Sequence, residues 1–285
     1  TRKESSAASD VYKRQEKYND KTLRADKDRH SFLVGVNGIT KNNVGYDFSL
    51  RKENDSSYGS QESTRTEAYY LFNPNLRFAL SNSTGFRNPS LYEMFDSTYG
   101  TKTLTPETTE TNRISISGKS KILNAGYSLN AYKSKISNLI ASASGTYIYY
   151  NANGETNISG IEGNINSQLA KKLFSNFGFA TTHKKTSDNK KNQLLPRYSL
   201  SGSLNYIIDK NFNLNTNLSY SEGSYDTSKV ELPSYTLVGL KGNFKINNKS
   251  QFNLLVVNVF DADYIVNRGY NTSGRALYLG FKSEF

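Results

Sequence analysis

The amino-acid sequence predicts an all-β protein whose strands cross a membrane as part of a β-barrel. Apolar and polar residues alternate along much of the chain, and a period of two places them on opposite faces of a strand. The mean hydropathy is only −0.66, yet the 285 residues include 21 Tyr and 15 Phe. A barrel with a wet lumen and aromatic girdles has this combination of a polar average with many aromatic residues.

The alternation is clearest at the end of the chain. In the closing run, Leu277, Leu279 and Phe281 share one face of a strand, and Tyr278 and Lys282 share the other. A soluble protein would cover such an apolar face with a second layer, whereas a barrel turns it to lipid. A soluble β protein therefore stays as the alternative. No apolar run approaches the ~18 residues of a spanning helix, which excludes a helical membrane protein.

The first part of the chain differs from the rest. Residues 1–28 are charged and lack sustained alternation, so we expect them to lie outside the barrel. Within them, Ser5–Gln15 (SSAASDVYKRQ) is typical of translated sequencing-adapter sequence, and a disordered or extracellular-loop segment is the alternative. The predicted barrel domain is therefore 29–285.

Regular alternation over 29–285 predicts about thirteen antiparallel strands of roughly 10 residues, the length that a tilted strand needs to cross a bilayer. The links between the strands alternate in length. Short links are expected near residues 40–43, 73–75, 119–122, 170–172, 209–211 and 245–250, and long ones near 52–62, 88–106, 140–157, 183–196, 222–233 and 261–275. Transmembrane barrels have short turns at one end and long loops at the other, so we expect the long links to be extracellular.

The net charge and the Cys and His content limit the possible functions. A net charge of +11 suits nucleic acid, an anionic lipid surface or an anionic ligand. Many of the bases lie in the short links: Lys119, Lys121, Lys171, Lys172, Lys210, Lys245 and Lys249. The chain has no Cys, and its two histidines, His30 and His183, are far apart in sequence. We therefore expect no metal site, no cofactor and no catalytic residues, so the protein is not expected to be an enzyme.

Several motifs occur in a fixed order from about residue 63 to the end of the chain. Ser83–Glu107 reads STGFRNPSLYEMFDSTYGTKTLTPE, Ser159–Glu162 reads SGIE, and Asn258–Asp261 reads NVFD. Together they resemble the motifs of TonB-dependent outer-membrane receptors, the family of siderophore and cobalamin receptors. The sequence departs from the family pattern at Asn88, where Ala is usual, and at Ser273, where Pro is usual.

The resemblance implies a 22-stranded transmembrane β-barrel in the bacterial outer membrane, of which 29–285 would be the C-terminal part. The plug domain would be absent from this chain, and TonB would act through that missing N-terminal region. The implied function is TonB-energised uptake of a metal chelate, with a ferric catecholate-type siderophore as the first choice. Cobalamin uptake by the same fold and a passive porin or adhesin barrel are the alternatives. Outer-membrane lipid and lipopolysaccharide are expected partners, and nucleic acid is not.

The long loops hold the best candidates for ligand binding, because recognition residues concentrate on loops carried by a rigid scaffold. Tyrosine rings together with basic side chains suit a flat, anionic catecholate complex, through stacking, cation–π contact and charge. No His occurs in 88–106, which argues against the family's heme-importing branch. The candidate residues are Arg87, Tyr92, Phe95, Tyr99, Tyr147, Tyr149, Tyr150, Tyr225, Arg268 and Tyr270.

Overall fold

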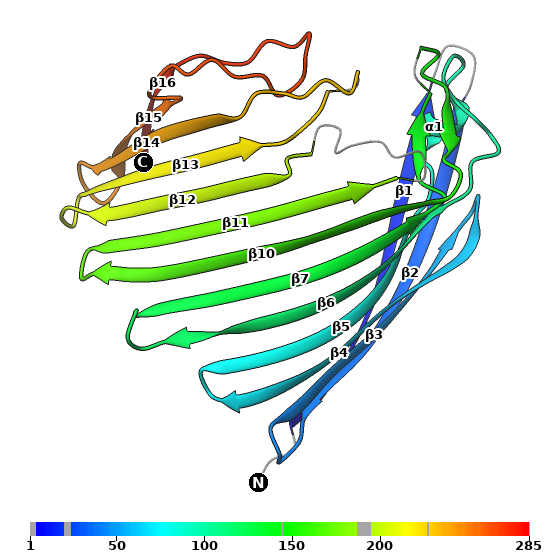
Figure 1. The fold of residues 1–285 in the computed structure, drawn as a ribbon, viewed down its shortest axis with the longest axis horizontal. Helices are drawn as coiled ribbons and strands as arrows, with labels where there is room; N and C mark the ends of the chain where they lie inside the picture. Colours follow the sequence, from blue (N-terminus) through cyan, green and yellow to red (C-terminus); the bar gives the residue numbers. More distant parts are fainter. Residues whose placement is uncertain (1–3, 20–23, 144, 187–194, 227, 285) are drawn as a thin grey trace. The chain divides into compact units, whose positions relative to one another are not determined.

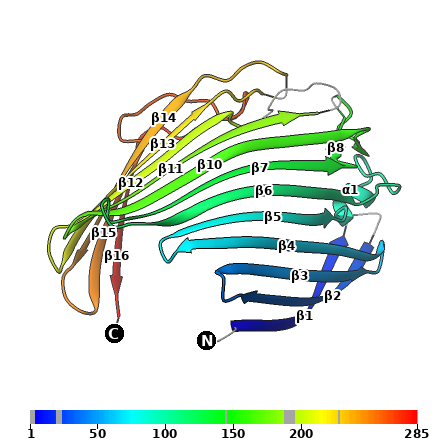
Figure 2. The same ribbon diagram turned by 60° about the horizontal axis from the view of Figure 1, so that its bottom comes forward.

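The computed structural model describes residues 4–19, 24–143, 145–186, 195–226 and 228–284. Within these residues, fourteen strands form one sheet, in which the strands follow one another in chain order from β1 to β16. The exceptions are β8 and β9, which form a separate two-stranded sheet, and one short helix, α1 (Figures 1 and 2).

The elements have the following bounds: β1 Glu4–Asn19, β2 Arg24–Ile39, β3 Val44–Asp55, β4 Gly59–Asn73, β5 Leu76–Arg87, α1 Leu91–Phe95, β6 Glu107–Ser120, β7 Ala125–Ser137, β8 Ile140–Ser142, β9 Tyr149–Asn151, β10 Glu155–Ala170, β11 Leu173–Lys185, β12 Tyr198–Ile207, β13 Phe212–Glu222, β14 Tyr235–Lys245, β15 Ser250–Val257 and β16 Ala276–Ser283. Among the described residues, no helix has the length and apolar character needed to cross a membrane.

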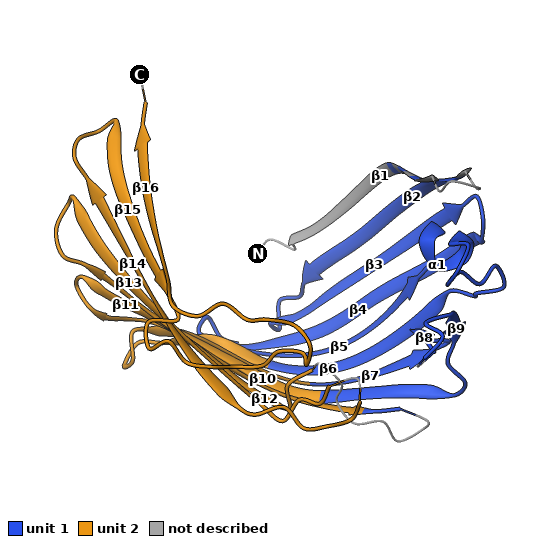
Figure 3. Cartoon of the chain, turned by 90° about the horizontal axis from the view of Figure 1, so that it is seen from above, with its two compact units in different colours: residues 1–115, 132–159, 185–189 blue, residues 116–131, 160–184, 190–285 orange. Residues whose placement is uncertain are grey.

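The chain divides into two compact units (Figure 3). Unit 1 comprises residues 1–115, 132–159 and 185–189, and unit 2 comprises 116–131, 160–184 and 190–285.

Unit 1 has one apolar and one charged sheet face. Val36 on β2 pairs with Phe48 on β3, and these side chains are 40% and 41% exposed. On the alternate face, Glu67 forms ion pairs with Arg65, at 3.3 Å, and with Arg77. Exposed apolar side chains on one face and ion pairs on the other are the arrangement expected of a barrel wall between lipid and a wet lumen.

Unit 2 repeats this division, with hydrogen-bonded amides on its polar face. Leu218 on β13 pairs with Val238 on β14, and Leu218 is 39% exposed. On the opposite face of the same two strands, the Asn243 amide donates a hydrogen bond of 2.7 Å to Asn213. The alternation predicted from the sequence is therefore confirmed in both units.

The predicted strand count is confirmed from residue 29 onward, where β2–β7 and β10–β16 supply the thirteen expected strands. The expectation that 1–28 lies outside the sheet is wrong for the described part. Residues Glu4–Asn19 form β1, which pairs with β2 in unbroken register from Glu4 opposite Ile39 to Asn19 opposite Arg24. Backbone hydrogen bonds can hold two strands together even where apolar and polar residues do not alternate. The hydropathy pattern therefore gave no sign of β1.

The prediction of one long link is also wrong. The predicted link 52–62 is a turn of three residues, because β3 continues to Asp55 and β4 begins at Gly59. Lys52 lies opposite Glu62 and forms an ion pair with it at 3.1 Å. Polar strand ends of this kind extend the hairpin beyond its apolar part. The other long links are present, although residues 187–194 of the predicted link 183–196 lie outside the described residues.

Candidate ligand site

The loop that joins β5 to β6 contains α1, whose first turn is fixed by a capping box. Ser90 accepts a hydrogen bond from the Glu93 backbone N–H at 3.2 Å, and Glu93 accepts one from the Ser90 N–H at 2.8 Å. These two bonds satisfy N–H groups that the start of a helix leaves without partners. Leu91 and Met94 are 1% and 4% exposed, so one side of α1 packs inward while Tyr92 remains exposed on the other.

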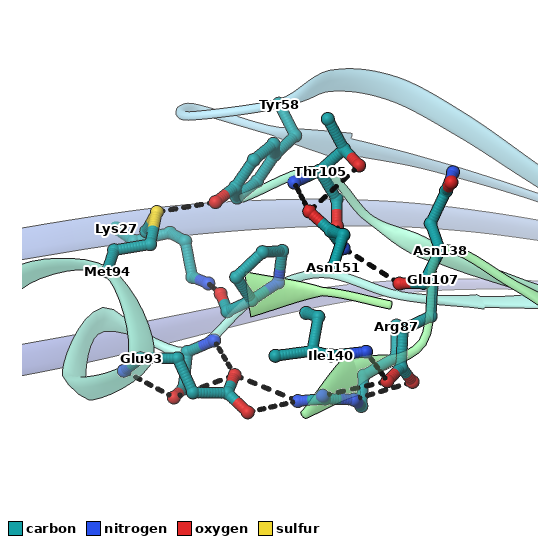
Figure 4. Close-up of polar contacts among 12 residues, drawn as sticks. Lys27, Tyr58, Arg87, Glu93, Met94, Thr105, Glu107, Asn138, Ile140 and Asn151 are labelled. Carbon is teal, nitrogen blue, oxygen red and sulfur yellow. Dashed lines mark hydrogen bonds and ion pairs between the residues drawn. The ribbon is translucent and has the colours of Figure 1, made fainter. Parts of the chain in front are cut away.

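Arg87 closes the base of this loop. Its Nε and Nη2 donate to the two carboxylate oxygens of Glu107, at 2.9 and 3.1 Å, and its Nη1 donates to Glu93 at 2.9 and 3.0 Å (Figure 4). Arg87 ends β5 and Glu107 begins β6, so the guanidinium joins the two ends of 88–106 and holds α1 to both. Glu107 also accepts a hydrogen bond of 2.6 Å from the Ile140 N–H on β8.

Burial and hydrogen bonding shift the pKa of Glu93 in opposite directions. Burial disfavours the charged carboxylate, but the hydrogen bonds from Arg87 and Ser90 outweigh it, so that the pKa of Glu93 lies below its ordinary value. The ionised carboxylate is therefore the form that holds α1 in place.

A buried pair anchors the loop to the neighbouring hairpin. Lys27 on β2 donates to the Pro89 carbonyl at 2.8 Å and lies 3.9 Å from Asp55 on β3. Asn88 donates to the same carboxylate at 3.0 Å. Lys27 and Asp55 are 2% and 3% exposed, so each charge depends on the other and on these hydrogen bonds. Asn88, which departs from the family pattern, thus contributes a side-chain hydrogen bond that Ala lacks.

Tyr58, in the β3–β4 turn, provides a second anchor. Its hydroxyl donates to the sulfur of Met94 on the inner side of α1 (Figure 4). Burial, with the nearby carboxylates of Asp55 and Glu93, raises the pKa of Tyr58 to about 12. The phenol therefore stays neutral and able to donate across the physiological range.

The β8–β9 hairpin is attached to the same loop. The Tyr149 N–H donates to the Tyr99 carbonyl at 2.9 Å. Asn151 accepts from the Thr105 N–H at 2.8 Å, and its amide donates to the carbonyls of Thr105 and Asn138 at 3.0 and 2.7 Å (Figure 4). The two loops are thus held to each other by hydrogen bonds between Tyr149 and Tyr99 and between Asn151 and Thr105.

Four tyrosines meet where the two loops join. The rings of Tyr92 and Tyr149 are 6.1 Å apart and edge-to-face, and those of Tyr99 and Tyr147 are 6.3 Å apart in the same geometry. Tyr147 has a positive φ of 60° and is 63% exposed. We call these four residues the tyrosine platform.

The structure brings seven of the ten predicted residues into these two loops of unit 1. They are the four platform tyrosines with Arg87, Phe95 and Tyr150, the last 36% exposed. Arg87 itself is held by two carboxylates, which the sequence reasoning missed. Glu93 and Glu107 lie 6 and 20 positions from it along the chain.

The other three predicted residues belong to unit 2. Arg268 forms an ion pair of 3.0 Å with Asp226, which is 2% exposed, and so ties the β15–β16 loop to the β13–β14 loop. Tyr225 forms an isolated β-bridge with Glu231, and Tyr270 is 73% exposed. A cavity of about 450 Å³ lies beside Tyr225, lined also by His183, Lys184, Arg197, Tyr198, Glu222, Gly223 and Glu231. Most of this lining was not predicted.

Strands of 8 to 16 residues with one apolar and one polar face, joined by short turns at one end and folded loops at the other, define a transmembrane β-barrel protein. The chain belongs to the TonB-dependent receptor family of such barrels. The family model described as "TonB dependent receptor-like, beta-barrel" matches residues 8–260. Members of this family lie in the bacterial outer membrane, which is where this chain functions.

Three proteins are similar to the chain in sequence or in fold. The vitamin B12 transporter BtuB of Vibrio cholerae serotype O1 is 28% identical over 284 residues, which are 95% of this chain and 45% of that protein. The siderophore receptor PirA from Pseudomonas aeruginosa has a TM-score of 0.79 at 16% identity, over 99% of this chain and 52% of that one. The copper transporter OprC has a TM-score of 0.77 at 12% identity, over 99% and 54%.

The chain thus spans less than half the length of the curated relative. The two similar structures show the fold alone. The names of the three proteins give three different ligands: vitamin B12, a siderophore and copper.

Proposed function

We propose that the chain is part of a receptor that takes up a large metal chelate across the outer membrane, with energy supplied through TonB. The family supports a transport receptor rather than an enzyme. TonB would act through the plug region that family resemblance places before the barrel. Ligand would be captured by the extracellular loops and released to the lumen when the plug moves.

The observation that carries this proposal is the tyrosine platform on its two anchored loops. A passive porin needs a pore and a constriction, but no rigid aromatic surface outside the barrel. Aromatic rings held by a fixed scaffold present a large contact area at a low cost in conformational entropy, which suits recognition of a bulky, flat ligand. Tyr92, Tyr99 and Tyr147 would make the first contact.

The charges around the platform favour a corrinoid of the vitamin B12 type over the catecholate expected from the sequence. Both arginines offered as anion contacts, Arg87 and Arg268, are engaged by carboxylates of their own loops. The loop 88–106 itself carries Glu93, Asp96 and Lys102, so it has no excess of positive charge. A nearly uncharged corrinoid needs none, and the curated relative is a vitamin B12 transporter.

A ferric catecholate siderophore remains the second candidate. The cavity beside Tyr225 supports it, because Lys184 and Arg197 line that cavity and the Arg197 guanidinium lies 5.3 Å from the Tyr198 ring centroid. Two acids, Glu222 and Glu231, line the same cavity and reduce its attraction for an anion.

The test is equilibrium binding of cyanocobalamin and of ferric enterobactin to the full-length receptor at low and high salt. Corrinoid recognition predicts tight cyanocobalamin binding that is insensitive to ionic strength, whereas a bound catecholate trianion would be held less tightly as salt rises. The double variant Tyr92→Ala/Tyr149→Ala should weaken binding about ten- to a hundredfold. The matched variant Tyr92→Phe/Tyr149→Phe keeps both rings and should retain most of the affinity. Equal affinities for the Ala and Phe variants would contradict a role for the platform.

A further inference from the structure

The sequence contains two Asn–Gly dipeptides, Asn37–Gly38 and Asn153–Gly154. In such a dipeptide, glycine has no Cβ to hinder the approach of its backbone nitrogen to the side-chain amide of the preceding asparagine. The structure places the two dipeptides in different settings, because the first lies within β2 and the second lies in the turn between β9 and β10. The same local sequence therefore has a different reactivity at each place.

The turn between β9 and β10 leaves Asn153–Gly154 open to solvent. Both residues are exposed, and both lie outside the strands, since β9 ends at Asn151 and β10 begins at Glu155. Gly154 has a positive φ of 79°, in a region that residues other than glycine seldom adopt. Strand pairing does not hold this step of the backbone extended, so the Gly154 nitrogen can turn toward the Asn153 side chain.

The other dipeptide is held by the sheet on both sides. Gly38 pairs with Ser5 on β1 and with Tyr46 on β3. It is buried, and a Cβ added to it would lie 2.6 Å from the Tyr46 hydroxyl oxygen. An extended strand keeps the nitrogen of each residue turned away from the preceding side chain. Asn37 can therefore react with the Gly38 nitrogen only after this part of β2 has left both neighbouring strands.

We propose that Asn153 is a site of spontaneous deamidation and that the isoaspartate product loosens the β8–β9 hairpin. The Gly154 nitrogen attacks Asn153 Cγ and forms a C–N bond, while the bond from Cγ to the side-chain amide nitrogen breaks. Ammonia leaves with the proton of the Gly154 N–H, and a succinimide ring remains. Water then opens the ring at either carbonyl and gives aspartate or isoaspartate. The net change is the uptake of water and the loss of ammonia, with no oxidation or reduction.

The turn is attached on both sides of the dipeptide, and isoaspartate adds a methylene carbon to the backbone between these attachments. Before the turn, the Asn151 amide donates to the carbonyls of Thr105 and Asn138 at 3.0 and 2.7 Å (Figure 4). After the turn, Thr156 is buried at 4% exposure. The added length, with a new negative charge, strains these attachments, so we expect the β8–β9 hairpin to open more often. The proposal is independent of the ligand that the receptor transports.

The test is peptide mapping by mass spectrometry of the detergent-solubilised full-length receptor, fresh and after incubation at mildly alkaline pH. We expect Asn153 to deamidate at least about tenfold faster than Asn37, because a turn opens more easily than a strand paired on both sides. In receptor unfolded by denaturant the two sites should react at similar rates, since both are Asn–Gly. Asn153→Gln should prevent the reaction at the turn, because the longer side chain would have to close a larger ring.

Limited proteolysis of the same samples measures the loosening. Proteinase K should cleave within residues 139–150 about threefold faster in the incubated receptor than in the fresh one, and incubation should leave the rate unchanged in Asn153→Gln. Equal deamidation of the two sites in the folded receptor, or none at Asn153, would overturn the proposal. Isoaspartate at position 153 with an unchanged cleavage rate would overturn its second part, the loosening of the hairpin.

Discussion

Tyr69 on β4 covers Gly45 on β3. The two residues are direct cross-strand partners, and a Cβ added to Gly45 would lie 1.9 Å from the ring carbon Cζ of Tyr69. The Arg77 guanidinium lies 4.1 Å from the centroid of the same ring. An aromatic ring laid over a cross-strand glycine is a known way to fix strand register, and here the ring also supports a lumen-facing cation.

Replacing Gly45 should therefore destabilise unit 1. Gly45→Ala forces the Tyr69 ring off Gly45 and away from Arg77, and we expect a loss of about 1–3 kcal/mol in the free energy of unfolding. Gly85→Ala is the matched control, because a Cβ there meets nothing within 4 Å. Denaturant unfolding of the refolded full-length receptor, followed by heat-modifiable migration, gives both values. Equal stabilities of the two variants would show that Tyr69 does not need Gly45.

The Arg87 bridge should control access to the loop 88–106. Arg87→Ala should raise the rate of proteinase K cleavage within 88–106 about fivefold, because local opening becomes ~1 kcal/mol easier. Glu107→Gln should act similarly, and the double variant should cost less than the sum of the two. Lys52→Gln, which breaks the exposed pair with Glu62, is the control and should leave the rate unchanged. A strictly additive double variant would contradict the bridge.

Acid should release α1. Since the folded-state pKa of Glu93 lies below its ordinary value of 4.5, its ionised form adds stability above that value. This stability is lost as the pH falls through the folded-state pKa. A nitroxide on Ser97→Cys should therefore gain mobility below about pH 4.5. In a Glu93→Gln background the label should already be mobile at pH 7. Constant mobility from pH 7 to pH 3 in the unaltered background would contradict this mechanism.

The predicted orientation can be checked with single cysteines, since this chain has no native Cys. Ser97→Cys lies in the loop after α1, and Ser120→Cys lies at the end of β6 beside a short turn. An impermeant thiol reagent applied to intact cells that express the full-length receptor should label position 97 alone. Labelling of position 120 alone would invert the topology and place the short turns outside the cell.

Strand positions could be predicted wherever one face is apolar, as in the closing run from Leu277 to Phe281. The prediction failed for β1 and for the β3–β4 hairpin. In that hairpin, the strand ends are polar on both faces and are held by backbone pairing and by ion pairs such as Lys52–Glu62. Alternation reports only the part of a strand that meets lipid. It therefore underestimates how far a strand continues beyond the membrane.

The candidate site was predictable to the level of residue type. Tyrosines in adjacent long loops meet because neighbouring strands carry those loops, and Tyr92 and Tyr149 do so. The state of the arginines was not predictable, because Glu107 and Asp226, which bind Arg87 and Arg268, are distant from them in sequence. Asp226 lies 42 positions from Arg268, and no local pattern links them. The expected anion contacts are instead parts of the scaffold.

The internal pairing of Arg87 and Arg268 has a kinetic consequence. The described loops produce little electrostatic field, so they do not steer a charged ligand toward them. The association rate constant should therefore stay within the range without steering, about 10⁵–10⁶ M⁻¹s⁻¹. Tight capture must then come from slow dissociation. In the receptor that we propose, capture would depend on residence time. Each bound molecule would stay long enough for an energised step, and the rate of import would follow how long the ligand is held more than how often it arrives.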